Sequence, residues 1–259
     1  MRAFHWRVVV LLTVLVLVVL WGTSRERRQR ARLRWNRPLE VAVVLLARGE
    51  VKPEVRAAWG QGVEQLEAWL EREAGRYRGD LNPPVNLTLT GPVPADVDFQ
   101  PPGESLVARA REAWRLSRTL SVLDEAAGLG SQRWDARIYV VLEPVGPEGE
   151  RLVEGMAEAG GSVGLVHGVL EDTTLTLELM AVAHELFHCL GVPDAYDAQG
   201  HARVPEGLVE PERAPLYPQP AAEVMVGEVP MGEAEGRLPE SLDEVRVGPA
   251  TAKALRWAP

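Results

Sequence analysis

The eleven residues from His184 to Asp194 constrain this chain more than any other part of its sequence. They read His-Glu-Leu-Phe-His-Cys-Leu-Gly-Val-Pro-Asp. His184 and His188 are four residues apart, so on an α-helix their rings lie on one face, one turn from each other. Two imidazoles at this spacing are suited to hold one zinc ion. Gly191 is expected to end the helix, because glycine readily takes the left-handed conformation found at helix ends.

Two acidic residues complete a candidate metal site. Glu185 stands beside the first histidine, where a carboxylate can accept a proton from a metal-bound water. Asp194 follows the predicted turn, ten residues after His184, and is the candidate third ligand. Three protein ligands leave the fourth position of a tetrahedral zinc open, which is typical of a catalytic site. Asp197 and His201 are alternative third ligands if the turn takes another course.

The longer string over residues 184–197, HELFHCLGVPDAYD, resembles the metzincin metallopeptidases in their HExxHxxGxxD form. Within them it is most similar to the immune-inhibitor-A-type bacterial peptidases. The resemblance implies an α+β fold with an α/β-like N-terminal lobe: a twisted sheet with helices, an active-site helix and a small irregular C-terminal lobe. It also implies one catalytic Zn²⁺, with Glu185 as the general base. A methionine-containing turn is expected beneath the metal, for which Met225 is the first candidate and Met231 the second.

Hydrophobic patterns predict alternating strands and helices before the zinc helix. Continuous or alternating apolar runs predict strands at 39–47, 85–90, 137–145 and 162–170. Helical spacing predicts helices at 53–75 and 104–127, and a zinc helix from residue 173 or 174 to 190. By the resemblance, the segment 162–170 is the edge strand that pairs with an extended peptide substrate. Its candidate contact residues are Gly164, Val166 and His167.

The N-terminal segment differs from the rest of the chain. Residues 8–21 form an apolar run broken only by Thr13, which is short for a membrane-spanning helix of about 20 residues. No clear small-residue cleavage site follows, so an uncleaved membrane anchor is favoured over a cleaved signal, which would give a secreted protein. Arginines flank the run on both sides, so the positive-inside rule conflicts with the outside location that the peptidase resemblance favours. We expect an anchored protein with an extracytoplasmic catalytic domain.

These features divide the chain into four predicted parts. Residues 1–23 are the membrane anchor or signal segment, 24–38 a basic linker, 39–191 the N-terminal catalytic lobe ending in the zinc helix, and 192–259 a C-terminal lobe with the third ligand and the methionine turn. The first 35 residues carry eight arginines and one glutamate, a net +7, so the overall −9 leaves −16 for the remainder. An acidic body excludes nucleic acid as a partner. It is compatible with Ca²⁺ binding, for which the sequence has no motif.

The sequence supports two classes of function. The first is a zinc-dependent endopeptidase that acts on a peptide or protein substrate. The alternative is a non-catalytic, membrane-tethered zinc-binding or interaction module. Glu185 favours the enzyme, because a purely structural zinc site needs no general base.

Overall fold

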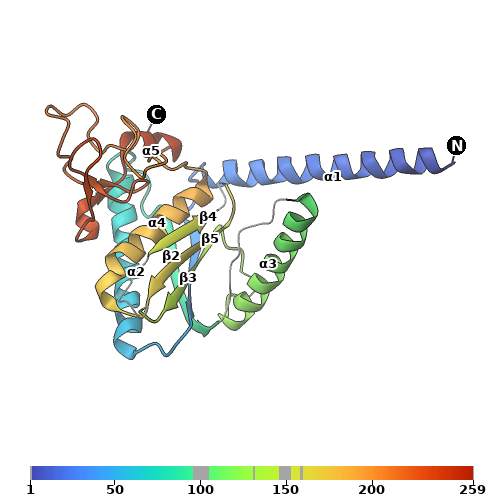
Figure 1. Ribbon diagram of the computed structural model, residues 1–259, viewed down its shortest axis with the longest axis horizontal. Helices are drawn as coiled ribbons and strands as arrows, with labels where there is room; N and C mark the ends of the chain where they lie inside the picture. Colours follow the sequence, from blue (N-terminus) through green and yellow to red (C-terminus); the bar gives the residue numbers. More distant parts are fainter. Residues whose placement is uncertain (1, 96–104, 131, 146–152, 158–159, 259) are drawn as a thin grey trace.

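The part of the chain that the computed structural model describes is built around a five-stranded sheet (Figure 1). The described residues are 2–95, 105–130, 132–145, 153–157 and 160–258. The strand order is β2-β1-β3-β5-β4, and every pairing is parallel except the antiparallel pair of β4 with β5. The strands are β1 (Leu39–Ala47), β2 (Val85–Pro94), β3 (Ala136–Glu143), β4 (Glu154–Ala157) and β5 (Val163–Val169).

Helices cover both faces of this sheet (Figure 1). On one face, α2 (Pro53–Gly75) and α4 (Leu175–Leu190) pack against the odd-numbered residues 41–45 of β1. On the other face, α3 (Leu106–Ala126) packs against the even-numbered residues 42–46. Because β1 is buried on both faces, its sequence is continuously apolar rather than alternating.

The N-terminal helix α1 (Arg2–Arg32) extends away from the sheet and joins it only at its C-terminal end (Figure 1). The predicted boundary between anchor and linker, at residues 23 and 24, falls inside this continuous helix. Within the part of the chain that the structure describes, no helix has the length and apolar character needed to cross a bilayer. The membrane anchor stays a prediction.

The C-terminal lobe, residues 192–258, consists of short elements joined by irregular segments. In this lobe β6 (Ala222–Glu223) pairs with β9 (Val245–Arg246), and β7 (Val229–Pro230) pairs with β8 (Gly236–Arg237). The helix α5 (Pro249–Ala254) closes the described chain, and the short 3-10 turns η1 (Asp172–Thr174) and η2 (Leu242–Glu244) precede α4 and β9. The fold class expected from the sequence is therefore confirmed: a mostly parallel sheet with helices, a helix carrying the histidines, and an irregular C-terminal lobe.

One expectation about the sheet is wrong. The segment 162–170 forms β5, which is paired with β3 on one side and with β4 on the other, so Gly164, Val166 and His167 do not lie on an edge strand. The edge is formed by β4, whose four residues Glu-Gly-Met-Ala lack the alternating apolar pattern of a strand. The helix predicted at 104–127 is confirmed as the slightly shorter α3, Leu106–Ala126; residue 104 lies outside the described residues.

Candidate metal centre

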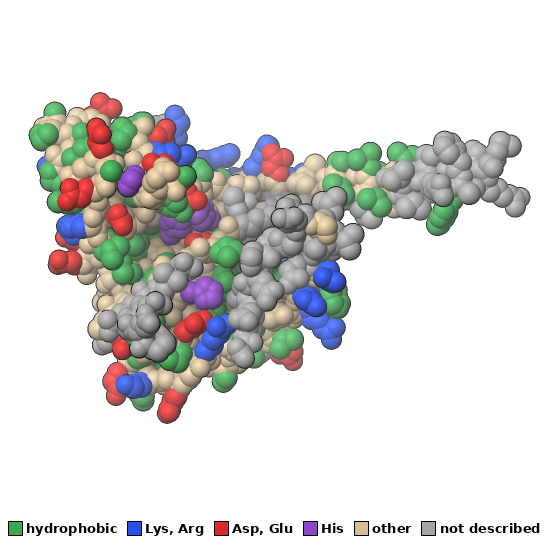
Figure 2. Space-filling view, viewed as in Figure 1, with side chains coloured by type: hydrophobic (Ala, Val, Ile, Leu, Met, Phe, Trp, Pro, Cys, Tyr) green, Lys and Arg blue, Asp and Glu red, His purple; other side chains and the backbone are tan. Residues whose placement is uncertain are grey.

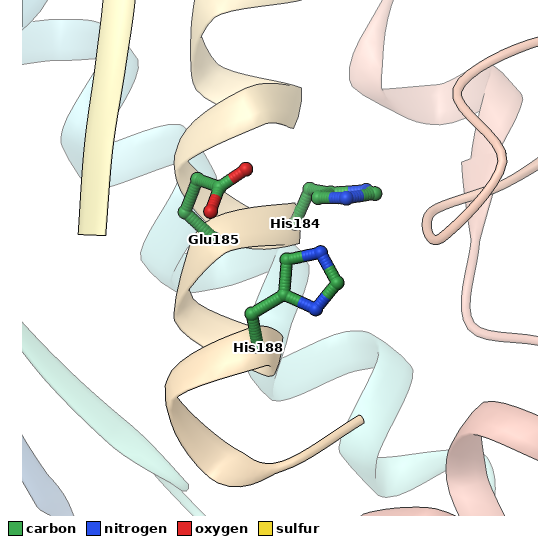
Figure 3. A group of neighbouring side chains, drawn as sticks. All are labelled: His184, Glu185 and His188. Carbon is green, nitrogen blue, oxygen red and sulfur yellow. The ribbon is translucent and has the colours of Figure 1, made fainter. Parts of the chain in front are cut away.

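The two histidines of the motif lie on one face of α4, as their spacing predicts. Figure 3 shows the rings of His184 and His188 projecting from the same side of the helix. Their centroids are 4.6 Å apart and the rings meet edge to face. On the surface, histidine side chains gather at the boundary between the C-terminal lobe and the sheet (Figure 2). The side chains of His184 and His188 are only 16% and 12% exposed, so the centre is sheltered but reachable.

The turn after α4 brings an aspartate to both imidazoles. Gly191 ends the helix with φ of 92°, a left-handed conformation that side chains rarely adopt. Asp194 is thereby placed with its Oδ1 3.2 Å from Nε2 of His184 and 3.1 Å from Nε2 of His188. The alternative third ligands Asp197 and His201 instead contact each other, since the Asp197 carboxylate accepts the backbone N–H of His201.

The hydrogen bonds of the imidazoles fix which nitrogen faces Asp194. Nδ1 of His184 lies 3.0 Å from the carbonyl oxygen of Val224, and Nδ1 of His188 lies 2.8 Å from that of Val192. A carbonyl oxygen only accepts, so each Nδ1 carries the hydrogen and donates it. In the neutral form of each imidazole, Nε2 then has its lone pair directed at Asp194, and this is the tautomer that binds metals through Nε2.

The separations within this arrangement can be compared with those of a zinc ligand set. Two ligands of a tetrahedral zinc with bonds of about 2.0–2.1 Å lie about 3.3–3.4 Å apart. The two Nε2–Oδ1 separations, 3.2 and 3.1 Å, are close to that value. Three atoms with lone pairs repel at this distance unless a proton or a metal cation lies between them.

The electrostatics of the cluster favour a positive charge. Burial lowers the pKa of His184, but the hydrogen bond with Asp194 and the Val224 carbonyl outweigh it and leave this pKa raised. The hydrogen bond with His184 lowers the pKa of Asp194 to about 2. The geometry and the charge balance thus suit a cation held between the three side chains.

Glu185 lies beside this cluster in a buried position. Glu185 is 2% exposed. One oxygen of its carboxylate lies within 4.8 Å of a ring nitrogen of each histidine. Burial raises the pKa of Glu185 to about 7, and its Oε2 has no hydrogen-bond partner among the described residues. Space for the carboxylate comes from Gly155 of β4, where an added Cβ would lie 2.8 Å from Cδ of Glu185. Glu185 is therefore a buried carboxyl group that its surroundings shift toward the protonated form.

A second turn, at residues 223–227, supports the site from the C-terminal lobe. Its Val224 carbonyl is the acceptor for His184, and Met225 beside it is fully buried in the core. The Glu223 carboxylate accepts hydrogen bonds from the N–H groups of Met225 and Gly248. Burial raises the pKa of Glu223. Met225 is thus buried next to the residue that accepts the His184 hydrogen bond, whereas Met231 is 37% exposed.

Sequence reasoning missed two groups that lie close to Asp194. Tyr196 lies close enough to Asp194 to lower the pKa of its carboxyl group, and burial together with the Asp194 charge raises the pKa of Tyr196. The guanidinium of Arg203 donates to the backbone oxygen of Asp194. Tyr196 was visible in the motif string, but nothing in the sequence shows that it folds back on the aspartate two residues before it.

Comparisons with known proteins give only distant similarities. No protein family and no curated protein matches the chain. Among solved structures, archaemetzincin from Methanopyrus kandleri has a TM-score of 0.36 at 13% identity, over 85% of this chain and 94% of its own. OgpA from Akkermansia muciniphila has a TM-score of 0.38 at 13% identity, over 83% of this chain and 58% of its own. A catalytically inactive OgpA with an O-glycopeptide substrate has a TM-score of 0.39 at the same identity and coverage.

Proposed function

We propose that this chain is a zinc-dependent peptidase that hydrolyses peptide bonds. The observation that carries the proposal is the convergence of both Nε2 atoms on the same oxygen of Asp194. Each imidazole also has its Nδ1 held by a backbone carbonyl, and a buried carboxyl lies alongside. Three ligands and a separate base are the components of a catalytic zinc site.

Each residue has a distinct role in the proposal. His184, His188 and Asp194 hold the zinc, which when bound makes a water acidic near neutral pH and polarises a carbonyl group. Glu185 accepts the proton of the attacking water and then donates it to the leaving amine. The raised pKa of Glu185 suits this exchange, because a group that titrates near neutral pH can both take and release a proton.

The edge strand β4 is the proposed substrate platform. Within the described part of the chain it pairs only with β5, so its outer edge is available to an extended peptide. Gly155 at its centre lies against Glu185, so a peptide paired with this edge runs past the proposed base. The substrate-contact role assigned to β5 from the sequence passes to β4.

Cleavage of a peptide pool by the full chain tests the proposal. We expect zinc-supplemented protein to cleave peptides, as followed by mass spectrometry, and Glu185→Gln to retain its zinc while losing about 10²–10⁴-fold in rate. Glu64→Gln, at an exposed position on α2, is the matched control and should cleave normally. Zinc-loaded wild-type protein that cleaves nothing would support the non-catalytic zinc-binding alternative. Equal cleavage by Glu185→Gln would remove Glu185 from the mechanism.

A further inference from the structure

The C-terminal end of α1 docks against the C-terminal end of α4, the helix that carries the histidines. Leu33 and Trp35, just after α1, are buried in the core, at 8% and 6% exposed.

 

The ring nitrogen of Trp35 donates a hydrogen bond to the Leu255 carbonyl at 2.7 Å. One turn earlier, the side-chain amide of Gln29 donates to the carbonyl of Leu190 at 3.3 Å. The last turns of α1 are therefore part of the folded body.

Two glycines leave the space that the Gln29 amide occupies. A Cβ added to Gly160 would lie 2.6 Å from Oε1 of Gln29, and one added to Gly191 would lie 3.1 Å from its Cδ. Gly191 is also the residue that turns the chain toward Asp194. Gln29 thus lies directly against the turn that connects α4 to the third ligand.

Arg32 connects α1 to the same place through backbone groups. Its guanidinium, on a residue that is only 8% exposed, donates to the carbonyls of Gly161 at 2.6 Å, Gly160 at 3.0 Å and Asp135 at 2.9 Å. The N–H of Gly160 in turn donates to the carbonyl of His188 at 2.8 Å. Gly160 therefore links the two residues: its carbonyl accepts from Arg32, and its N–H donates to His188.

We propose that Arg32 and Gln29 are positioning residues for the metal centre. The last carbonyls of a helix have no partners within it, and the end of the helix carries partial negative charge. Gln29 binds one such carbonyl, and Arg32 fixes the segment that binds another while adding a positive charge nearby. Together they hold the last turn of α4, and with it His188, in register with Asp194. This inference rests on the proposed zinc site.

Zinc affinity of the full chain, measured by competition with a chromogenic chelator, tests the inference. We expect Arg32→Ala to weaken zinc binding about tenfold, in the range seen when groups that support metal ligands are removed. Arg30→Ala is the matched control, because Arg30 is exposed on the same helix and pairs with Glu26. It should change the affinity by less than about twofold.

Unfolding of the metal-free protein by urea separates positioning from a general structural role. If Arg32→Ala lowers the unfolding free energy but its folded fraction binds zinc as tightly as the wild type, the inference is wrong. Should Arg32→Ala fail to fold, Gln29→Ala removes only the Leu190 contact and should still weaken zinc binding; unchanged affinity there overturns the proposal. Wild-type protein that binds no zinc would instead refute the proposed function.

Discussion

Glu178 lies on α4 seven residues before Glu185, so the two carboxyl groups share one face of the helix. Its side chain is fully buried against Gly168 of β5, and its Oε1 accepts hydrogen bonds from the Val169 N–H and the Thr174 hydroxyl. Burial raises the pKa of Glu178 from 4.5 to about 7, against the opposing effect of these two hydrogen bonds. Ionised Glu178 should therefore destabilise the fold.

The raised pKa predicts how stability depends on pH. Below pH 4.5 the carboxyl is protonated in both the folded and the unfolded chain, and the folded state bears no cost. As the pH rises to 7, the unfolded chain ionises first, so the unfolding free energy falls. At about 1.4 kcal/mol per pKa unit, the total loss of unfolding free energy approaches about 3 kcal/mol and levels off about one pH unit above the folded pKa.

Glu178→Gln removes this titration while keeping an acceptor oxygen. We expect the difference in unfolding free energy between the variant and the wild type to be about 2 kcal/mol larger, in favour of the variant, at pH 8 than at pH 5. Urea unfolding at the two pH values, with a chelator present to exclude metal effects, measures this difference. Glu64→Gln, exposed on α2, is the control and should show no such change. An equal effect of Glu178→Gln at both pH values would refute the reasoning.

Two further substitutions test the surroundings of the centre. Gly155→Ala introduces a Cβ 2.8–2.9 Å from Cδ and Cγ of Glu185, so the carboxylate must move. We expect zinc to be retained while peptidase activity falls about 10²-fold, the effect of a displacement of about 1 Å. Unchanged activity would contradict the assigned position of the base. Glu223→Ala leaves the buried N–H groups of Met225 and Gly248 without their acceptor, at about 1–3 kcal/mol each. The urea unfolding free energy should fall by about 3 kcal/mol, and a loss below about 1 kcal/mol would show that the turn does not depend on Glu223.

The zinc helix could be predicted because its information is local. The spacing of His184 and His188 and the glycine at 191 determine a helix face and a helix end within eight residues. The same turn places Asp194 without any distant partner having to be known. The buried strand β1 was equally predictable, because burial on both faces leaves a continuous apolar run.

The remaining parts of the site depend on contacts between distant segments. The strand β4 is four residues long and takes its place through pairing with β5. Glu223 and Arg32 are charged residues that sequence reasoning assigns to solvent. Both are buried, and their partners are mainly backbone groups. For Arg32 these partners lie up to 129 residues away in the sequence, so no local sequence pattern predicts the contacts.

Zinc content per chain tests the central claim most directly. Dialysed wild-type protein, Asp194→Ala and the control Asp197→Ala can be compared by elemental analysis under identical conditions. The account predicts about one zinc per chain in the wild type and in Asp197→Ala, and a large loss in Asp194→Ala. Folded wild-type protein without zinc, or full zinc retention by Asp194→Ala, would contradict the assignment of His184, His188 and Asp194 as the metal ligands.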